Sequence, residues 1–265
     1  MKNIHSHRHG FTLLELSVVL VIISVLLAGG ATIFATSLQK RQLDETNAKM
    51  VAIQAALLDF RRANNRLPCP ADITLGLTSA SFGVTAAING GQCSGGSPAS
   101  NFTLASPLLA GGMVPVRTLN LPDDYAFDGW GRRILYVISS AYTATDAFST
   151  YSITSPAAGA TVYDGYGTAA GNTKISAAVY VLVSMGANGH GAYPRAGGST
   201  RINTASANTY ELENCECNSS GVSGTFDQYF HQKIFTLDPA TANRTNDFDD
   251  IVVYASRGQV RSLNE

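Results

Sequence analysis

The chain has 265 residues, and its 18 basic and 19 acidic side chains leave a formal net charge of -1 at pH 7. This balance excludes a strongly basic chain and gives no electrostatic footprint for nucleic acid, so no nucleic-acid partner is indicated. Hydrophobic residues make up 45% of the chain, enough for a core of ordinary size, and the longest apolar run lies near the amino terminus.

The first segment, MKNIHSHRHG at residues 1–10, is polar and cationic, and the apolar run follows it directly. From Phe11 to Gln39 that run contains a single charged residue, Glu15. Because about 20 apolar helical residues cross the hydrocarbon core of a bilayer, residues 11–39 are predicted to form a transmembrane helix. A carboxylate in that helix costs on the order of 3 kcal/mol near the membrane centre, so Glu15 requires a partner.

The junction HGFTLLEL, from His9 to Leu16, resembles the leader of type IV prepilins, a signal that the pseudopilins of type II secretion share. An ordinary secretory signal carries its small-residue cleavage site after the apolar part, whereas Gly10 precedes it here. The resemblance implies that prepilin peptidase removes the leader, residues 1–10, by cutting between Gly10 and Phe11 and then methylates Phe11. A simple signal anchor with an incidental glutamate is the alternative.

Cleavage at that bond would give Glu15 a role in assembly. The cut creates an ammonium group at Phe11, and N-methylation keeps its positive charge. A buried cation and a buried carboxylate each need the other. Phe11 and Glu15 lie four residues apart on one helix and can pair locally. The family resemblance implies instead that Glu15 meets the amino terminus of a neighbouring pilin or pseudopilin subunit.

Two glycines, Gly29 and Gly30, weaken the middle of the apolar helix, because each costs about 1 kcal/mol relative to alanine. One interpretation is that residues 28–32 extend locally when the chain is assembled into a filament. The other is that the small residues allow close packing of helices in the membrane. The sequence leaves both interpretations open.

Residues 40–66 are predicted to continue the same helix as an amphipathic half. Apolar positions recur there at steps of three and four, which places them on one face that we expect to pack against the head. The positions are Leu43, Thr46, Met50, Ile53, Leu57 and Phe60. Pro68 and Pro70 cannot continue a helix, so the helix is expected to end near Asn65.

Residues 67–265 are predicted to form a β-rich globular head, periplasmic or extracellular, with long loops at 71–107 and 186–230. Short runs of β-branched and aromatic residues predict the strands of an antiparallel sheet. The runs lie at residues 134–138, 149–153, 177–184, 233–237 and 250–256. The fold class is therefore predicted to be α+β and pilin-like, with a long amino-terminal helix packed on an antiparallel sheet.

The four cysteines fall into two local groups, and a domain exported across the inner membrane meets disulfide-forming conditions. We favour a bond between Cys69 and Cys93, which closes a loop where the helix ends. A bond between Cys215 and Cys217 spans one residue and is less certain, and the other connectivities stay open because four cysteines permit three. As a further alternative, Cys215 and Cys217 bind a metal with His231 as a third ligand.

Three islands of the head resemble the major pseudopilin of type II secretion. They are DGWGRRILYV, SMGANG and DFDDIVVY. In that family the last two islands frame a calcium site, so the resemblance nominates Asp247, Asp249 and Asp250 as calcium ligands, together with backbone oxygens of residues 184–189. Asn188 departs from the family pattern, which often has aspartate there. The alternative is that Asp249 and Asp250 cap a turn and face solvent.

The family resemblance implies a structural subunit of a type IV pilus or a type II secretion pseudopilus, and comparison with the size of abundant pilins implies a minor or large-headed subunit. An enzyme is not expected, because the chain has no G-x-S-x-G, no H-E-x-x-H and no phosphate-binding glycine loop. No cofactor is required, and calcium is an optional one. The alternative function is a tip-exposed adhesin or ligand-binding pilin that uses the filament as a stalk.

The expected partners follow from the same resemblance. They are prepilin peptidase, other pilin or pseudopilin subunits, an inner-membrane assembly platform, and membrane lipid before assembly. The expected location is the bacterial inner membrane, crossed once with a cytoplasmic amino terminus and a periplasmic head, and afterwards the filament.

Overall fold

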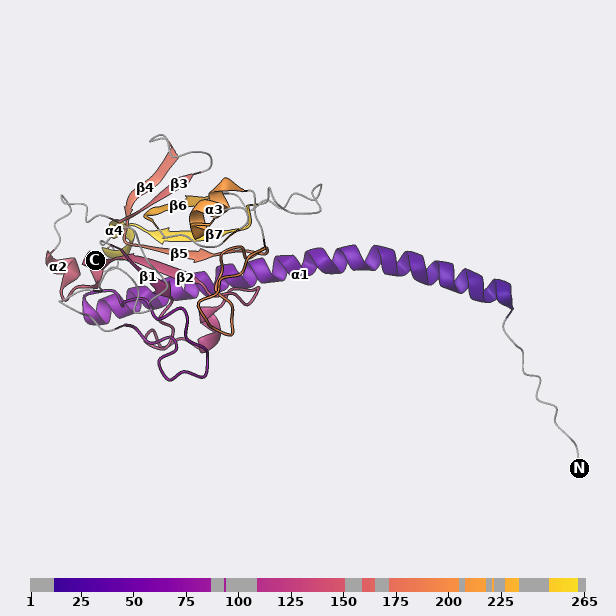
Figure 1. Cartoon of the computed structure of the whole chain (residues 1–265), viewed down its shortest axis with the longest axis horizontal. Helices are drawn as coiled ribbons and strands as arrows, with labels where there is room; N and C mark the ends of the chain where they lie inside the picture. The colour runs from indigo at the N-terminus through magenta and orange to yellow at the C-terminus, as the bar shows by residue number, and fades with distance from the viewer. Residues whose placement is uncertain are drawn as a thin grey trace, which may run out of the picture. The chain divides into compact units, whose positions relative to one another are not determined.

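The computed structural model describes residues 12–86, 93, 109–150, 159–164, 172–204, 208–217, 221, 227–233 and 248–261. The chain divides into two compact units, Met1–Gln42 and Leu43–Glu265, which we call the N-terminal and C-terminal units. Helix α1 (Leu13–Asn64) contributes residues to both units, and the named strands and shorter helices all lie in the C-terminal unit (Figure 1).

Within the N-terminal unit, α1 begins with a side-chain cap. The Thr12 hydroxyl accepts a hydrogen bond from the Glu15 backbone N–H at 3.2 Å, which satisfies one donor of the first turn. The helix continues without a break through Gly29 and Gly30, and the extension of residues 28–32 in a filament stays a prediction. Among the described residues, no helix meets the length and apolarity of a membrane span.

Within the C-terminal unit, α1 buries the apolar face that its spacing predicts. Thr46, Met50, Ile53 and Leu57 are at most 1% exposed and face the core, while Leu43 and Phe60 at the two ends are half-buried. The three apolar members pack in one cluster with side chains from the strands. The prediction that this half of the helix packs against the head is therefore confirmed.

The carboxyl end of α1 also lies where the sequence places it. The helix ends at Asn64, and Asn65 takes a left-handed conformation with φ of 51°, which asparagine tolerates better than most residues. Its N–H donates to the Arg61 carbonyl at 2.8 Å. The chain then continues without regular secondary structure through Pro68, which cannot continue a helix.

The larger sheet has four strands in the order β1-β2-β5-β7, antiparallel throughout. They are β1 (Leu109–Met113), β2 (Leu135–Ser139), β5 (Tyr180–Ser184) and β7 (Ile251–Ala255). β2, β5 and β7 confirm three of the predicted runs. β1 escaped prediction because its sequence, LAGGM, lacks β-branched residues. Gly112 is needed there, since a Cβ would lie 2.4 Å from the Ala71 carbonyl oxygen.

The smaller sheet has the order β4-β3-β6, built from β3 (Ala160–Asp164), β4 (Thr173–Ala178) and β6 (Tyr229–Gln232). Its strands β3 and β6 run parallel, so the expectation of a purely antiparallel head is wrong at this pair. The predicted run at 177–184 is divided at Val179, because β4 ends in the smaller sheet and β5 begins in the larger one.

Two other predicted runs lie mostly outside the described residues, and for those parts the strands stay predictions. Residues 149 and 150 belong to the short helix α2 (Ala147–Thr150), and residues 151–153 lie outside the described residues. Of the run at 233–237 only Lys233 is described, one residue after β6 ends. The remaining short helices are η1 (Asp123–Ala126), η2 (Ser140–Thr143), α3 (Thr209–Cys215) and α4 (Arg257–Arg261).

Packing of α1 on the larger sheet can be tested with two substitutions on the same helix. Ile53→Ala removes a side chain that is 0% exposed, and we expect it to lower the free energy of unfolding by about 3 kcal/mol, because it leaves a cavity in the core. Val51→Ala, at a position that is 66% exposed, should change it by less than about 0.5 kcal/mol. Urea titration of the full chain in detergent measures both, and equal losses would contradict the packing.

Candidate functional site

The first candidate site is the start of α1, where Glu15 lies in the first turn. Its side chain is exposed, as are all the side chains from residue 12 to residue 25. Gly10 and Phe11, the residues of the predicted cleavage, lie outside the described residues. The described part of this site is therefore an exposed carboxylate at the head of an exposed helix.

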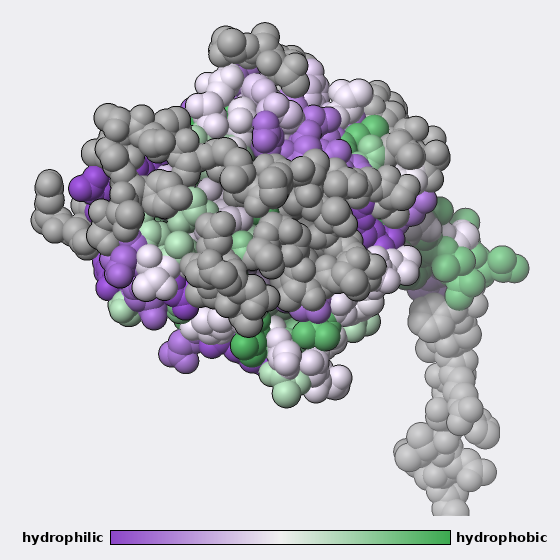
Figure 2. Space-filling view, turned by 60° about the vertical axis from the view of Figure 1, so that its left-hand side comes forward, coloured by the Kyte–Doolittle hydropathy of each residue, from purple (hydrophilic) through white to green (hydrophobic). Residues whose placement is uncertain are grey.

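The apolar side chains before and after Glu15 form an apolar surface on several faces of the helix. Exposed fractions range from 45% at Ile23 to 89% at Leu13. The members are Leu13, Leu14, Leu16, Val18, Val19, Leu20, Val21, Ile22, Ile23 and Val25. Some of these hydrophobic residues are visible as the green patch at the right of Figure 2. We call this set the apolar surface of α1. Soluble monomers rarely expose a continuous apolar surface of this extent, so it requires a cover of lipid or protein.

The second candidate site is a cluster of three buried carboxyl groups in the C-terminal unit, Glu211, Asp249 and Asp250. One carboxylate oxygen from each lies within 4.8 Å of the others, and the three residues are 2%, 0% and 4% exposed. Glu211 comes from the first turn of α3, and the two aspartates directly precede β7. The alternative that Asp249 and Asp250 face solvent is therefore wrong, and Asp247 lies outside the described residues.

Backbone and amide donors hold this acidic cluster in place. Glu211 accepts from the Asp249 N–H at 2.7 Å and from the Asn188 side-chain amide at 2.8 Å. Asp249 accepts from the Asn188 backbone N–H at 2.6 Å, and Asp250 accepts from the Asn214 side-chain amide at 3.0 Å. Asn188, which departs from the family pattern, thus joins two of the three carboxyl groups.

Burial makes the charged state of the cluster costly. Burial first, and then repulsion from Glu211, raises the pKa of the Asp249 carboxyl to about 8. The same two causes raise the pKa of Asp250 well above its ordinary value. Three ionised carboxylates at these distances would repel one another strongly, so the cluster must hold either protons or a cation.

The donor set fits a hard cation such as calcium, which takes six to eight oxygen ligands. Asp249 Oδ1 is buried and has no hydrogen-bond partner among the described residues, which is the state expected of an oxygen reserved for a ligand. Two of the nominated backbone oxygens are already engaged, however. The Arg132 guanidinium donates to the carbonyls of Gly186 and Ala187, the latter at 2.8 Å.

Glu211 was missed at the level of sequence for a physical reason. It stands three residues after Asn208, whose side chain caps α3 by accepting from the N–H groups of Tyr210 and Glu211. A glutamate at that position usually supports the cap itself. Only the fold brings this residue, 38 positions from Asp249 in sequence, to the aspartates.

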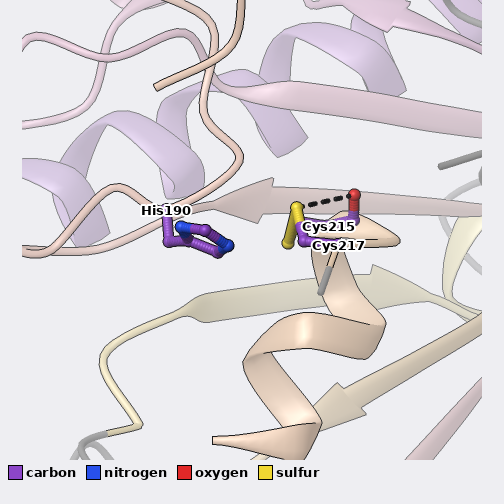
Figure 3. A group of neighbouring side chains, drawn as sticks. All are labelled: His190, Cys215 and Cys217. Atoms are coloured by element: carbon purple, nitrogen blue, oxygen red, sulfur yellow. Dashed lines mark hydrogen bonds between the residues drawn. A yellow bond between two sulfur atoms is a disulfide. The ribbon is translucent and has the colours of Figure 1, made fainter. Parts of the chain in front are cut away.

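The cysteines form two disulfides, Cys69 with Cys93 and Cys215 with Cys217. The first is the pairing that the sequence favoured, and both of its cysteines are buried. Next to the second lies His190, not His231, with one ligand atom of each of the three residues within 4.8 Å of the others (Figure 3). His231 instead lies on β6, where it stacks on Tyr163 at 5.3 Å between ring centroids.

Comparison with known proteins bears on the first site. Residues 5–31 match the family model described as the prokaryotic N-terminal methylation motif. The chain carries the signal of type IV pilins and pseudopilins. The matched residues include Gly10, Phe11 and Glu15, so the motif supports a pilin-like subunit that is processed by prepilin peptidase and assembled with others of its kind. No curated protein and no solved structure matches the chain.

The raised carboxyl pKa values predict how stability depends on pH without metal. An acid whose pKa is higher in the folded than in the unfolded state stabilises the fold while protonated, and this contribution is lost as pH rises. In EDTA the melting temperature of the full chain should therefore fall between about pH 4 and pH 8. Asp249→Asn, which mimics the protonated form, should flatten that fall, whereas Asp59→Asn on the exposed side of α1 should not. An unchanged slope for Asp249→Asn would contradict the prediction.

Proposed function

We propose that this chain is a structural, large-headed or minor subunit of a type IV pilus or a type II secretion pseudopilus. Prepilin peptidase cuts it between Gly10 and Phe11 and methylates Phe11. The observation that carries the proposal is the apolar surface of α1, which lies within the residues matched by the methylation motif and is uncovered in the single chain. A polymer of parallel helices is one of the few arrangements that buries such a surface in an exported protein.

The same surface supports a membrane-anchored precursor. Before assembly, residues 11–39 cross the inner membrane with a cytoplasmic amino terminus, and lipid covers them. After extraction by an inner-membrane assembly platform, neighbouring subunits replace the lipid. Glu15 then sets the position of each subunit along its neighbours in the filament, because a carboxylate in an apolar bundle is stable only beside a cation. The methylated amino group of an adjacent Phe11 supplies that cation.

A second candidate function is recognition by the head. Its support is the size of the C-terminal unit, Leu43–Glu265. In that case the head is a tip-exposed adhesin or ligand-binding domain, and the filament serves as its stalk. Immunogold labelling separates the two functions, since label at the tip alone favours recognition and label along the shaft favours a bulk subunit.

Assembly can be tested with two substitutions that each remove one exposed carboxylate from α1. Glu15→Gln should leave processing intact, so that the amino-terminal peptide still begins at methylated Phe11, but should reduce incorporation into filaments at least tenfold, because the partner cation is lost. Asp44→Asn should assemble normally. Peptide mass spectrometry and quantitation of the sheared filament fraction measure the two effects.

Two results would contradict the proposal. One is a mature protein that retains residues 1–10 in cells with an active prepilin peptidase. The other is normal assembly of Glu15→Gln. As a control for processing, the wild-type chain in cells without the peptidase should retain Met1 to Gly10.

We also propose that Glu211, Asp249 and Asp250 bind calcium in the C-terminal unit. The support is the buried cluster of three carboxyl groups, together with the unpartnered oxygen of Asp249. Bound calcium would neutralise the mutual repulsion of the carboxylates and tie α3 to the start of β7.

Calcium binding predicts a shift in melting temperature. At pH 7.5, millimolar calcium should raise the melting temperature of the full chain in detergent by several degrees relative to EDTA. Asp250→Asn should abolish the shift, and Asp164→Asn, which removes an exposed carboxylate paired with Lys174, should retain it. No shift and no heat of binding in isothermal titration of the wild type would end the calcium proposal.

A further inference from the structure

The disulfide between Cys215 and Cys217 differs from the one between Cys69 and Cys93 in span and in burial. Its cysteines are two positions apart in sequence, against 24 for the other bond. By restricting the unfolded chain, a disulfide raises the folding equilibrium constant by a factor that grows roughly as the three-halves power of loop length. That factor is about 20- to 40-fold smaller for the shorter bond, so the fold depends less on this bond. Cys217 is also half-buried, whereas Cys69 and Cys93 are both buried.

The surroundings of this bond accommodate the reduced form. Cys217 Sγ lies 3.3 Å from the Cys215 carbonyl oxygen, and Cys215 Sγ lies 3.6 Å from the Leu212 carbonyl oxygen. While the cysteines are joined in a disulfide, neither sulfur carries a proton to donate to these carbonyl oxygens. After reduction, each thiol could donate its proton to the carbonyl oxygen that already lies beside it. Gly191 forms one wall of the site, since a Cβ there would lie 2.7 Å from Cys217 Sγ. The Arg201 guanidinium donates to the Cys215 carbonyl at 2.6 Å.

His190 adds a polar group beside the sulfurs. Figure 3 shows its imidazole ring directed at the disulfide, and the residue is 2% exposed. The Thr204 N–H donates to Nδ1 at 3.3 Å, so the neutral ring carries its proton on Nε2. A neutral imidazole binds a metal through an unprotonated nitrogen, and here that nitrogen faces the Thr204 amide. The arrangement therefore favours a hydrogen-bond donor toward sulfur over a metal ligand.

We propose that Cys215 and Cys217 form an exchangeable disulfide, a site at which the head reacts with thiols. A thiolate of an external thiol attacks Cys217 Sγ, the more accessible sulfur. A new bond forms between the two sulfurs while the Cys215–Cys217 bond breaks, and its electron pair leaves on Cys215 Sγ as a thiolate that His190 stabilises. A second thiolate then attacks the mixed disulfide. It releases the oxidised external thiol and leaves Cys217 as a thiolate, and both cysteines take protons from water.

The test uses the full chain in detergent at pH 7.5 with EDTA, exposed to graded reduced and oxidised glutathione and then alkylated. Peptide mass spectrometry follows both disulfides in the same sample. We expect Cys215–Cys217 to open at least tenfold faster than Cys69–Cys93, with glutathione attached to Cys217 in the trapped intermediate. Equal rates, or glutathione attached first to Cys215, would overturn the proposal.

Two matched histidine variants separate a specific role of His190 from general loosening of the fold. His190→Gln should slow opening of Cys215–Cys217 about threefold or more and leave Cys69–Cys93 unchanged. His231→Gln, at another buried histidine, should alter neither rate. If His190→Gln accelerates both bonds or leaves the first unchanged, the assigned role of His190 is wrong. Because the wild-type ratio of rates needs no variant, the exchange proposal is decided even if a variant fails to fold.

Discussion

The dominant constraint on this protein is the hydrophobic effect acting on one helix. From Leu13 to Val25, α1 exposes ten large apolar side chains that the single chain leaves in contact with solvent. At about 25 cal/mol per Å² of apolar surface, covering them is worth many kcal/mol, far more than any surface ion pair supplies. This surface must be covered by lipid or protein. The methylation motif, which marks a pilin-like processed subunit, supports the proposal that membrane lipid and then neighbouring subunits cover it.

The other half of the same helix meets the opposite condition. Met50, Ile53 and Leu57 are almost fully buried and pack in one cluster with the strands. The apolar side chains at the carboxyl end of α1 are thus buried by the chain itself, whereas those at its amino end are exposed to solvent. The difference lies in the pattern of the sequence, since apolar residues occupy one face in 43–60 but most positions in 11–39.

Periodic and local features of this fold could be predicted from the sequence, and features that depend on long-range contacts could not. The buried face of α1, its end beside Asn65 and strands β2, β5 and β7 all follow from spacing or from proline. β1 was missed because glycine there serves a close backbone approach to Ala71, which no local pattern reveals. Glu211 was missed because it lies in a segment predicted as a long loop, and only the fold brings it to Asp249. His190 was missed beside Cys215 because only the fold brings the two together.

The disulfide between Cys69 and Cys93 has a mechanical consequence. It joins the first residues after α1 to a position whose backbone N–H is anchored on the Thr143 hydroxyl at 2.9 Å. In the proposed filament, a subunit pulled through its helix would transmit the load into the head at this point. The 24 residue steps between the cysteines represent about 80 Å of contour length, which the covalent bond keeps out of the force path. Tension would then pass through the disulfide to the Cys93 anchor, and not through the backbone between the two cysteines.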